Sequence, residues 1–204
     1  MLSNGVINNQ QQLEELSPKR IGFLGGSFNP VHEGHIALVE YVLEHHVDYI
    51  VFCPHSLHPN KKEILVSIEH RVNMIQILKE ISRYAPRMLT IHPSYLEGTH
   101  GTKFISLCEQ LNRKGFYTSI ICGIDCFSRP YPEYLYHFDH YIGIRSTGCC
   151  EEKIRELISG KIVFFETPFP TLSSTEIRAK VSDKRMYEIH EQLREYIREN
   201  RLFQ

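Results

Sequence analysis

Apolar residues along this chain occur in short continuous runs that alternate with longer stretches of helical spacing. The continuous runs cover residues 20–24, 49–53, 88–92, 119–123, 141–144 and 161–165. By contrast, the helical spacing, with apolar positions every three or four residues, covers residues 33–46, 67–84, 101–113, 151–158 and 187–201. Strands that alternate with helices predict an α/β fold, in which a parallel sheet has helices on both faces and binds ligands at the carboxyl ends of its strands.

Length and composition fit one globular domain of ordinary size. The chain has 204 residues, of which 42% are hydrophobic and 23% are charged. Its first residues are polar and contain no long apolar run. We therefore expect a mobile tail over residues 1–18, with a short helix at residues 13–16 as the alternative, and a single domain over residues 19–204.

Charge and cysteine content narrow the class of protein further. The formal net charge of -1 favours neither nucleic acid nor a membrane surface as a partner. The six cysteines form no C-x-x-C pair, so no zinc site is predicted and a reducing compartment is the simplest interpretation. No stretch approaches the roughly 18 apolar residues of a membrane span. These features predict a cytoplasmic protein, and they leave its oligomeric state open.

The segment after the first predicted strand has the sequence GGSFNPVHEGH, residues 25–35. Its first two residues, Gly25 and Gly26, allow a close backbone approach that a side chain would block. Asn29 and Pro30 suit the N-cap and first position of the helix that follows, and a helix N-terminus attracts anions. On this interpretation two histidines, at positions 32 and 35, lie on one face of the first turn. For two histidines alone, ordinary surface positions would be the simpler interpretation.

A second segment, LSSTEIR at residues 172–178, has the spacing of a helix start. Ser173 and Glu176 are three residues apart, as in a capping box, and Arg178 follows within the first turns. Hydroxyl groups, free main-chain N–H groups and an arginine at one helix start favour a polyphosphate ligand. An ordinary capped helix is the alternative.

The string GGSFNPVHEGH resembles the signature of the HxGH nucleotidyltransferases, most closely that of the bacterial nicotinate mononucleotide adenylyltransferases. LSSTEIR resembles the ISSTxIR motif of the same family. The resemblance implies a Rossmann-like nucleotidyltransferase fold, ATP as a substrate, and Mg2+ that accompanies ATP. It also implies that His32, His35 and Arg178 are catalytic. The implied ATP-binding residues are Gly25, Gly26, Ser27, Phe28, Gly34, Ser173, Ser174 and Thr175.

Shorter matches point to the acceptor substrate. ICGID at residues 121–125 resembles the family's G-[AS]-D element, and residues 54–62 resemble its P-x-x-x-P-P-H-K loop, with Asn60 in place of histidine. Ser67 and Arg71 resemble an S-x-x-x-R element, and residues 94–96 partly resemble an S-Y-T region. The implied substrate-binding residues are Lys61, Arg71, Asp125 and Tyr95. A metal site on His55 and His58 is disfavoured because no cysteine or third histidine is near them in the sequence.

The chain has no tryptophan, which the family often places after the aspartate element. We expect the acceptor pocket between the turn at residues 32–35 and the segment at residues 125–138. That segment offers five aromatic side chains: Phe127, Tyr131, Tyr134, Tyr136 and Phe138.

The resemblance implies transfer of AMP from ATP to nicotinate mononucleotide, which gives deamido-NAD and pyrophosphate. Two alternatives remain at this point. The first is the same fold with another acceptor, of which nicotinamide mononucleotide is the nearest and phosphopantetheine is more remote. The second is a non-catalytic ATP-binding sensor. Cytidylyl transfer is disfavoured because its C-terminal motif differs from LSSTEIR.

Overall fold

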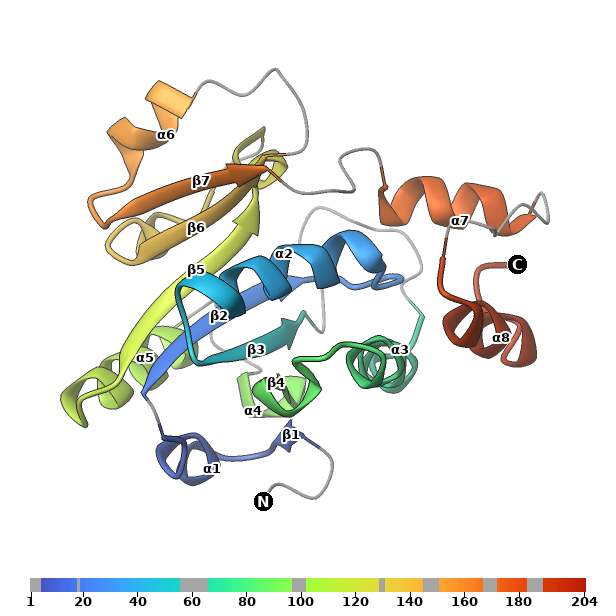
Figure 1. Cartoon of the computed structure of the whole chain (residues 1–204), viewed down its shortest axis with the longest axis horizontal. Helices are drawn as coiled ribbons and strands as arrows, with labels where there is room; N and C mark the ends of the chain where they lie inside the picture. Colours follow the sequence, from blue (N-terminus) through green and yellow to red (C-terminus); the bar gives the residue numbers. More distant parts are fainter. Residues whose placement is uncertain are drawn as a thin grey trace.

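The computed structural model describes residues 5–17, 19–55, 66–96, 102–128, 131–144, 151–166, 172–182 and 189–204. Their core is a seven-stranded sheet in the order β1-β4-β3-β2-β5-β6-β7, and every neighbouring pair of strands is parallel (Figure 1). The strands are β1 (Val6–Ile7), β2 (Arg20–Gly26), β3 (Tyr49–Pro54), β4 (Met88–Ile91), β5 (Tyr117–Gly123), β6 (Asp139–Ile144) and β7 (Ile162–Glu166). The predicted parallel sheet is therefore confirmed.

Helices connect the strands and cover the sheet. They are α1 (Gln10–Glu14), α2 (Glu33–His45), α3 (Ile68–Glu80), α4 (Pro93–Leu96), α5 (Thr102–Arg113), α6 (Glu151–Leu157), α7 (Ser174–Ser182) and α8 (Glu191–Glu199). Short 3-10 turns are η1 (Ala85–Arg87), η2 (Ile124–Ser128) and η3 (Glu133–Leu135). Within the described residues, no helix is long and apolar enough to cross a membrane.

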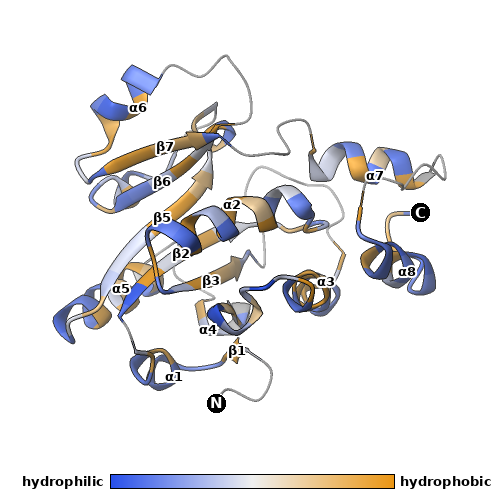
Figure 2. Ribbon diagram, viewed as in Figure 1, coloured by the Kyte–Doolittle hydropathy of each residue, from blue (hydrophilic) through white to orange (hydrophobic). Residues whose placement is uncertain are grey.

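Alternate strand residues pack on opposite faces of the sheet, as the pleat requires. In β2, Leu24 joins the apolar cluster under α2 and α3, whereas Phe23 joins the cluster under α5. In β5, Ile121 joins the first cluster, and its neighbour Cys122 packs under α6. Figure 2 shows the result as apolar strands between helices that mix apolar and polar residues. Both faces are thus covered, which explains why the strands appear in the sequence as continuous apolar runs.

The strand order reverses between β2 and β5. From β2 the chain first adds β3 and β4 on one side through α2 and α3, and it then crosses to place β5 on the other side. In a parallel sheet with this strand order, ligands bind outside the carboxyl ends of the strands at the reversal point. The glycines that end β2 and the aspartate that follows β5 lie at that point. Figure 1 shows α7 and α8 on the side to which the strands β2 and β3 run.

Residues 5–17 differ from the tail expected over residues 1–18, because the structure packs them on the sheet. Strand β1 pairs with β4, with Val6 opposite Thr90 and Ile7 opposite Ile91. Ile7 and Leu13 are both 0% exposed within the cluster under α5. The apolar residues of this segment are too few and too far apart for periodicity to reveal. Their burial adds a seventh strand and covers the edge of β4.

We predict that Leu13→Ala lowers the free energy of unfolding by about 2–5 kcal/mol, the range found when a buried leucine leaves a cavity. Urea unfolding of the full chain measures the change. Leu157→Ala is the matched control, because Leu157 is 45% exposed and its loss should have little effect. Equal stability of the two variants would show that residues 5–17 are not part of the packed domain.

Candidate active site at the carboxyl edge of β2

The turn after β2 is built around side chains that leave little room for a Cβ. A Cβ at Gly26 would lie 3.0 Å from Phe28 Cζ, and one at Gly25 would lie 3.1 Å from His55 Nε2. Phe28 has a φ of 48° and is 2% exposed. Its ring meets those of Phe52 and His35 edge-on, with centroids 5.6 and 5.3 Å away. The predicted ATP-binding phenylalanine therefore packs into the core beneath the turn.

Helix α2 begins later than the sequence predicted. We expected Asn29 as the N-cap, but His32 takes that place, and its Nδ1 accepts a hydrogen bond of 3.2 Å from the Gly34 N–H. In return, His35 Nδ1 accepts one of 3.3 Å from the His32 N–H. The predicted cap is wrong because imidazole nitrogens supply the acceptors that the helix start needs. Asn29 Oδ1 instead accepts a bond of 3.2 Å from the Val66 N–H.

These caps fix which nitrogen of each ring carries a proton. Because Nδ1 accepts in both histidines, the neutral imidazoles carry their hydrogen on Nε2. The two ring centroids are 3.9 Å apart, and His32 is 1% exposed. The structure thus brings His32 and His35 together at a helix N-terminus, as predicted. Two adjacent N–H donors at such a position form an arrangement that suits phosphate oxygens.

The carbonyl groups of this turn accept hydrogen bonds from side chains far away in the sequence. The Ser27 carbonyl accepts from Arg71 Nη1 at 2.9 Å, and the Asn29 carbonyl accepts from Arg178 Nη1 at 2.7 Å. The Pro30 carbonyl accepts from Ser174 Oγ at 2.8 Å. Helices α3 and α7 therefore hold the turn from two sides.

Arg71 is buried, and its guanidinium is occupied by main-chain carbonyl groups. It is 1% exposed, and it also donates to the carbonyls of His55 at 2.6 Å and Val66 at 3.1 Å. Burial lowers the pKa of its guanidinium, which stays charged near neutral pH. The structure thus gives Arg71 a bracing role between β2 and β3, and its predicted contact with substrate stays a prediction.

The start of α7 has the predicted cap. Ser173 Oγ accepts a bond of 3.2 Å from the Glu176 N–H and donates one of 2.7 Å to the Glu176 carboxylate. Thr175 Oγ1 accepts from Arg178 Nη2 at 3.3 Å. Ser174 and Arg178 of this motif contact the turn after β2, and this joins the two motifs of the sequence in one place.

The predicted acceptor residues are more dispersed. Asp125 is exposed in η2, directly after β5, and so lies at the strand reversal point as expected. Tyr95 lies in α4 with its hydroxyl against the main chain of Gln10, and burial raises its pKa. Lys61 lies outside the described residues. The substrate contacts of all three residues stay predictions.

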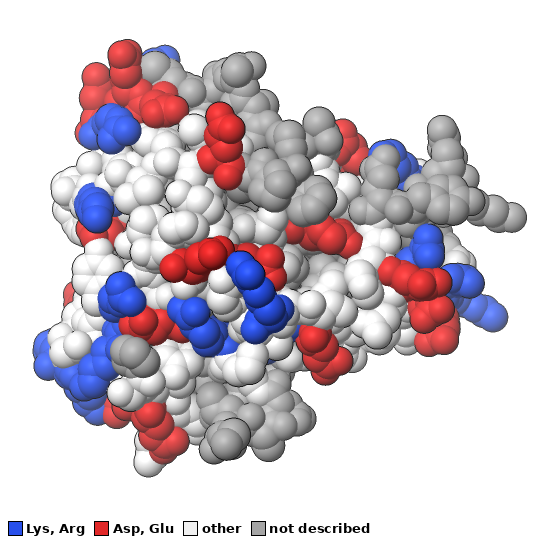
Figure 3. Space-filling view, in the orientation of Figure 1, with Lys and Arg blue, Asp and Glu red and all other residues white. Residues whose placement is uncertain are grey.

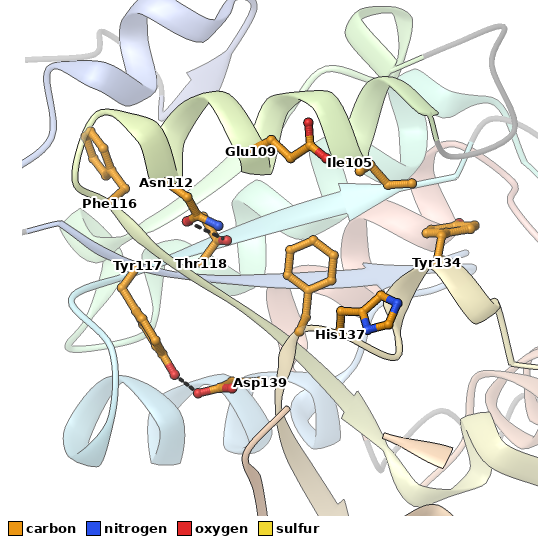
Figure 4. Close-up of a pocket in the computed structure, with 10 residues that line it drawn as sticks. Ile105, Glu109, Asn112, Phe116, Tyr117, Thr118, Tyr134, His137 and Asp139 are labelled. Atoms are coloured by element: carbon orange, nitrogen blue, oxygen red, sulfur yellow. Dashed lines mark hydrogen bonds between the residues drawn. The ribbon is translucent and has the colours of Figure 1, made fainter. Parts of the chain in front are cut away.

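The aromatic segment at residues 125–138 does not line one edge of the sheet. Phe127 and Tyr131 pack together with ring centroids 4.3 Å apart, and the Tyr131 hydroxyl is 3.0 Å from His140 Nε2. Tyr134 and Phe138 instead line a cavity of about 420 Å³ with Tyr117 (Figure 4). Contrary to expectation, Phe138 lies at the amino edge of the sheet, directly before β6, because the chain must return there before this parallel strand begins.

Strand order, glycine turn and paired imidazoles define a nucleotide-binding site of the kind that transfers nucleotidyl groups. The family model described as cytidylyltransferase-like matches residues 23–180. The chain therefore belongs to the cytidylyltransferase-like family. The match covers both motifs and all the strands from β3 to β7.

Individual relatives are similar over most of their length. A probable nicotinate-nucleotide adenylyltransferase of Caldicellulosiruptor bescii is 26% identical over 197 residues, which cover 90% of this chain and 98% of that protein. The nicotinate-nucleotide adenylyltransferase of Bacillus subtilis is 27% identical over 197 residues, which cover 91% and 99%. Plasmodium falciparum nicotinic acid mononucleotide adenylyltransferase complexed with NaAD has the same fold, with a TM-score of 0.75, 21% identity and coverage of 91% and 97%.

We predict that Arg71→Lys lowers the free energy of unfolding by about 2–4 kcal/mol. One ammonium group cannot reproduce a planar fork that serves several carbonyls, and buried groups without partners are costly. Thermal and urea unfolding measure the loss. Arg113→Lys is the control, because Arg113 is exposed and pairs with Glu109 on its own helix. Wild-type stability in Arg71→Lys would refute the bracing role.

Proposed function

We propose that this protein transfers the adenylyl group of ATP to nicotinate mononucleotide and releases deamido-NAD and pyrophosphate. The observation that carries the proposal is the pair of imidazoles at the start of α2, held against the start of α7 by Arg178 and Ser174. The relatives in C. bescii and B. subtilis bear this activity in their names.

The reaction needs positioning more than a strong base. The phosphate of the mononucleotide is ionised at neutral pH, so one of its oxygens attacks the α-phosphorus of ATP directly. A new phosphorus–oxygen bond forms as the bond to pyrophosphate breaks, and no proton has to be removed. Catalysis by such a site consists of holding two anions in line and stabilising the charge that develops.

The described residues supply that stabilisation. The Nε2–H groups of His32 and His35 are donors for phosphate oxygens, and their other ring nitrogens are held by main-chain bonds. The N-terminus of α7 contributes a positive dipole end beside Arg178. Because these groups are fixed before substrate binds, little reorganisation is needed during the reaction.

Magnesium enters this proposal with ATP. Mg2+ prefers oxygen ligands and is commonly held by substrate phosphates with few protein groups, where it neutralises phosphate charge. Asp125 is the exposed carboxylate at the strand reversal point that would suit such an ion. Among the described residues, no group of three histidine, cysteine or acidic side chains forms a protein-bound metal site. In this proposal the phosphate oxygens of ATP supply most of the Mg2+ ligands.

Pyrophosphate release tests the proposed function directly. The purified chain is mixed with Mg2+, ATP and either nicotinate mononucleotide, nicotinamide mononucleotide or phosphopantetheine, and initial rates are compared. The proposal expects the highest kcat/KM with nicotinate mononucleotide. A higher kcat/KM with another acceptor would make that compound the substrate in place of nicotinate mononucleotide. ATP binding without pyrophosphate release in the presence of any acceptor would indicate a non-catalytic sensor.

We predict that His35→Ala lowers kcat by a factor of about 10² or more, the usual effect of removing one preorganised donor. His45→Ala is the matched control, because His45 is exposed in the last turn of the same helix. Steady-state pyrophosphate release measures both variants. A folded His35→Ala protein with wild-type kcat would remove this histidine from the chemical step.

We also predict that Arg178→Ala weakens ATP binding by about tenfold or more, the scale of one charge-assisted contact. Calorimetric titration with ATP measures the change, and thermal unfolding checks that α7 stays in place. Arg83→Ala is the control, since Arg83 is exposed and pairs with Glu44. Unchanged ATP affinity in Arg178→Ala would show that this arginine stabilises the turn but does not bind ATP.

A further inference from the structure

A third histidine, His55, lies beside the turn after β2 but on the other face of the sheet. Val51 and Cys53 of β3 pack in the cluster under α5, and position 55 continues their alternation. In β2, Phe23 packs in the same cluster, and Gly25 is the next residue on that face. By contrast, helix α2 with its two histidines packs in the cluster on the opposite face.

The main chain of His55 is fixed on both sides. Its N–H donates to the Gly26 carbonyl at 2.9 Å, which extends the pairing of β3 with β2 by one residue. Its carbonyl accepts from Arg71 Nη1 at 2.6 Å, and the same Arg71 nitrogen also donates to the Ser27 carbonyl. The backbone of His55 is therefore held in place next to the turn, and this limits where its imidazole can lie.

Gly25 brings the imidazole close to the turn. The place where a Cβ of Gly25 would be lies 3.1 Å from His55 Nε2, so the ring lies against the backbone of this glycine. His55 is exposed at the carboxyl edge of the sheet. The ring is thus at the surface where ligands of such sheets bind, next to a main chain that lacks a side chain.

The two faces of the turn suit two different substrates. Helices α2 and α7 place His32, His35 and Arg178 on one face, where the proposed function puts ATP. A second anion that attacks ATP in line must approach from another direction. The face of Gly25 that carries His55 lies on the other side of the turn from the proposed ATP site.

We infer that the His55 side chain binds an anionic group of the acceptor, either the carboxylate of its ring or its phosphate. This inference rests on the proposed function. An imidazole offers an N–H donor and, when protonated, a positive charge. Both oxygens of a carboxylate accept a hydrogen bond from the imidazole N–H. A carboxamide has one such oxygen, and its NH2 group is a donor that cannot accept this bond. If the group is the ring carboxylate, the side chain favours the acid over the corresponding amide; if it is the phosphate, the side chain binds both alike.

Kinetics of His55→Ala and His55→Asn test the inference. In His55→Ala we expect the KM for nicotinate mononucleotide to rise by about tenfold or more, the scale of a lost charge-assisted contact, while the KM for ATP changes little. His55→Asn keeps a donor without a charge and should fall between the two proteins. Neither change removes the main-chain bonds of residue 55, so both variants should fold. His137→Ala, an exposed histidine at the opposite edge of the sheet, is the control.

Binding without ATP separates the possible anionic groups. The Cε1–H signal of His55, assigned by its loss in His55→Asn, is followed by NMR during titration with nicotinate mononucleotide, nicotinamide mononucleotide or inorganic phosphate. A shift with the acid alone identifies the ring carboxylate, and a similar shift with all three identifies the phosphate. No shift with any of them, together with an unchanged KM in His55→Ala, overturns the inference.

The two proposals fail in different ways. If the wild-type protein releases no pyrophosphate with any acceptor but the His55 signal still shifts, the proposed function fails and the anion site stands. If turnover of nicotinate mononucleotide is normal while the signal and the KM in His55→Ala do not change, the function stands and the assignment of His55 fails.

Discussion

The structure depends on one local requirement: the carbonyl groups of the turn after β2 need partners, and the turn itself cannot supply them. Buried main-chain groups without hydrogen bonds are costly, so nearly all are paired in folded proteins. Here Arg71 serves the Ser27 carbonyl from α3, and Ser174 serves the Pro30 carbonyl from α7. The turn and the start of α7 are thereby joined at the point where the strand order reverses, although Pro30 and Ser174 are 144 residues apart in the sequence.

The same bonds prepare the site for chemistry. Because the turn is held from both sides, the N–H donors at the start of α2 keep their direction without a bound ligand. A site that handles two anions gains most from such fixed donors, since flexible ones would have to be ordered during the reaction. Figure 3 shows acidic and basic side chains interspersed over the face in view, in keeping with the net charge of -1. Phosphate is therefore attracted by the groups of the site itself and not by the overall charge of the protein.

Sequence periodicity predicts much of this fold, because fully covered strands leave continuous apolar runs such as residues 20–24 and 119–123. The two motifs also predict that a helix begins in each of them, although the N-cap of α2 is His32 and not Asn29. The sequence does not reveal that Arg71 donates to main-chain carbonyl groups, because a carbonyl is present at every residue and leaves no mark in the sequence. Nor does it reveal strand β1, a two-residue strand that only its pairing with β4 defines.

The central claim is that the turn after β2 separates two substrate sites, one for the adenylate and one for the acceptor. A crystal structure of the protein with deamido-NAD bound tests it most directly. The account predicts that the adenylate half lies on the side of α2 and α7, with phosphate oxygens within hydrogen-bond distance of His32 and His35 Nε2. It also predicts that the pyridine half lies on the His55 side of Gly25. A dinucleotide with both halves on the α2 face, or one bound in the cavity lined by Tyr117 and Phe138, would contradict the claim.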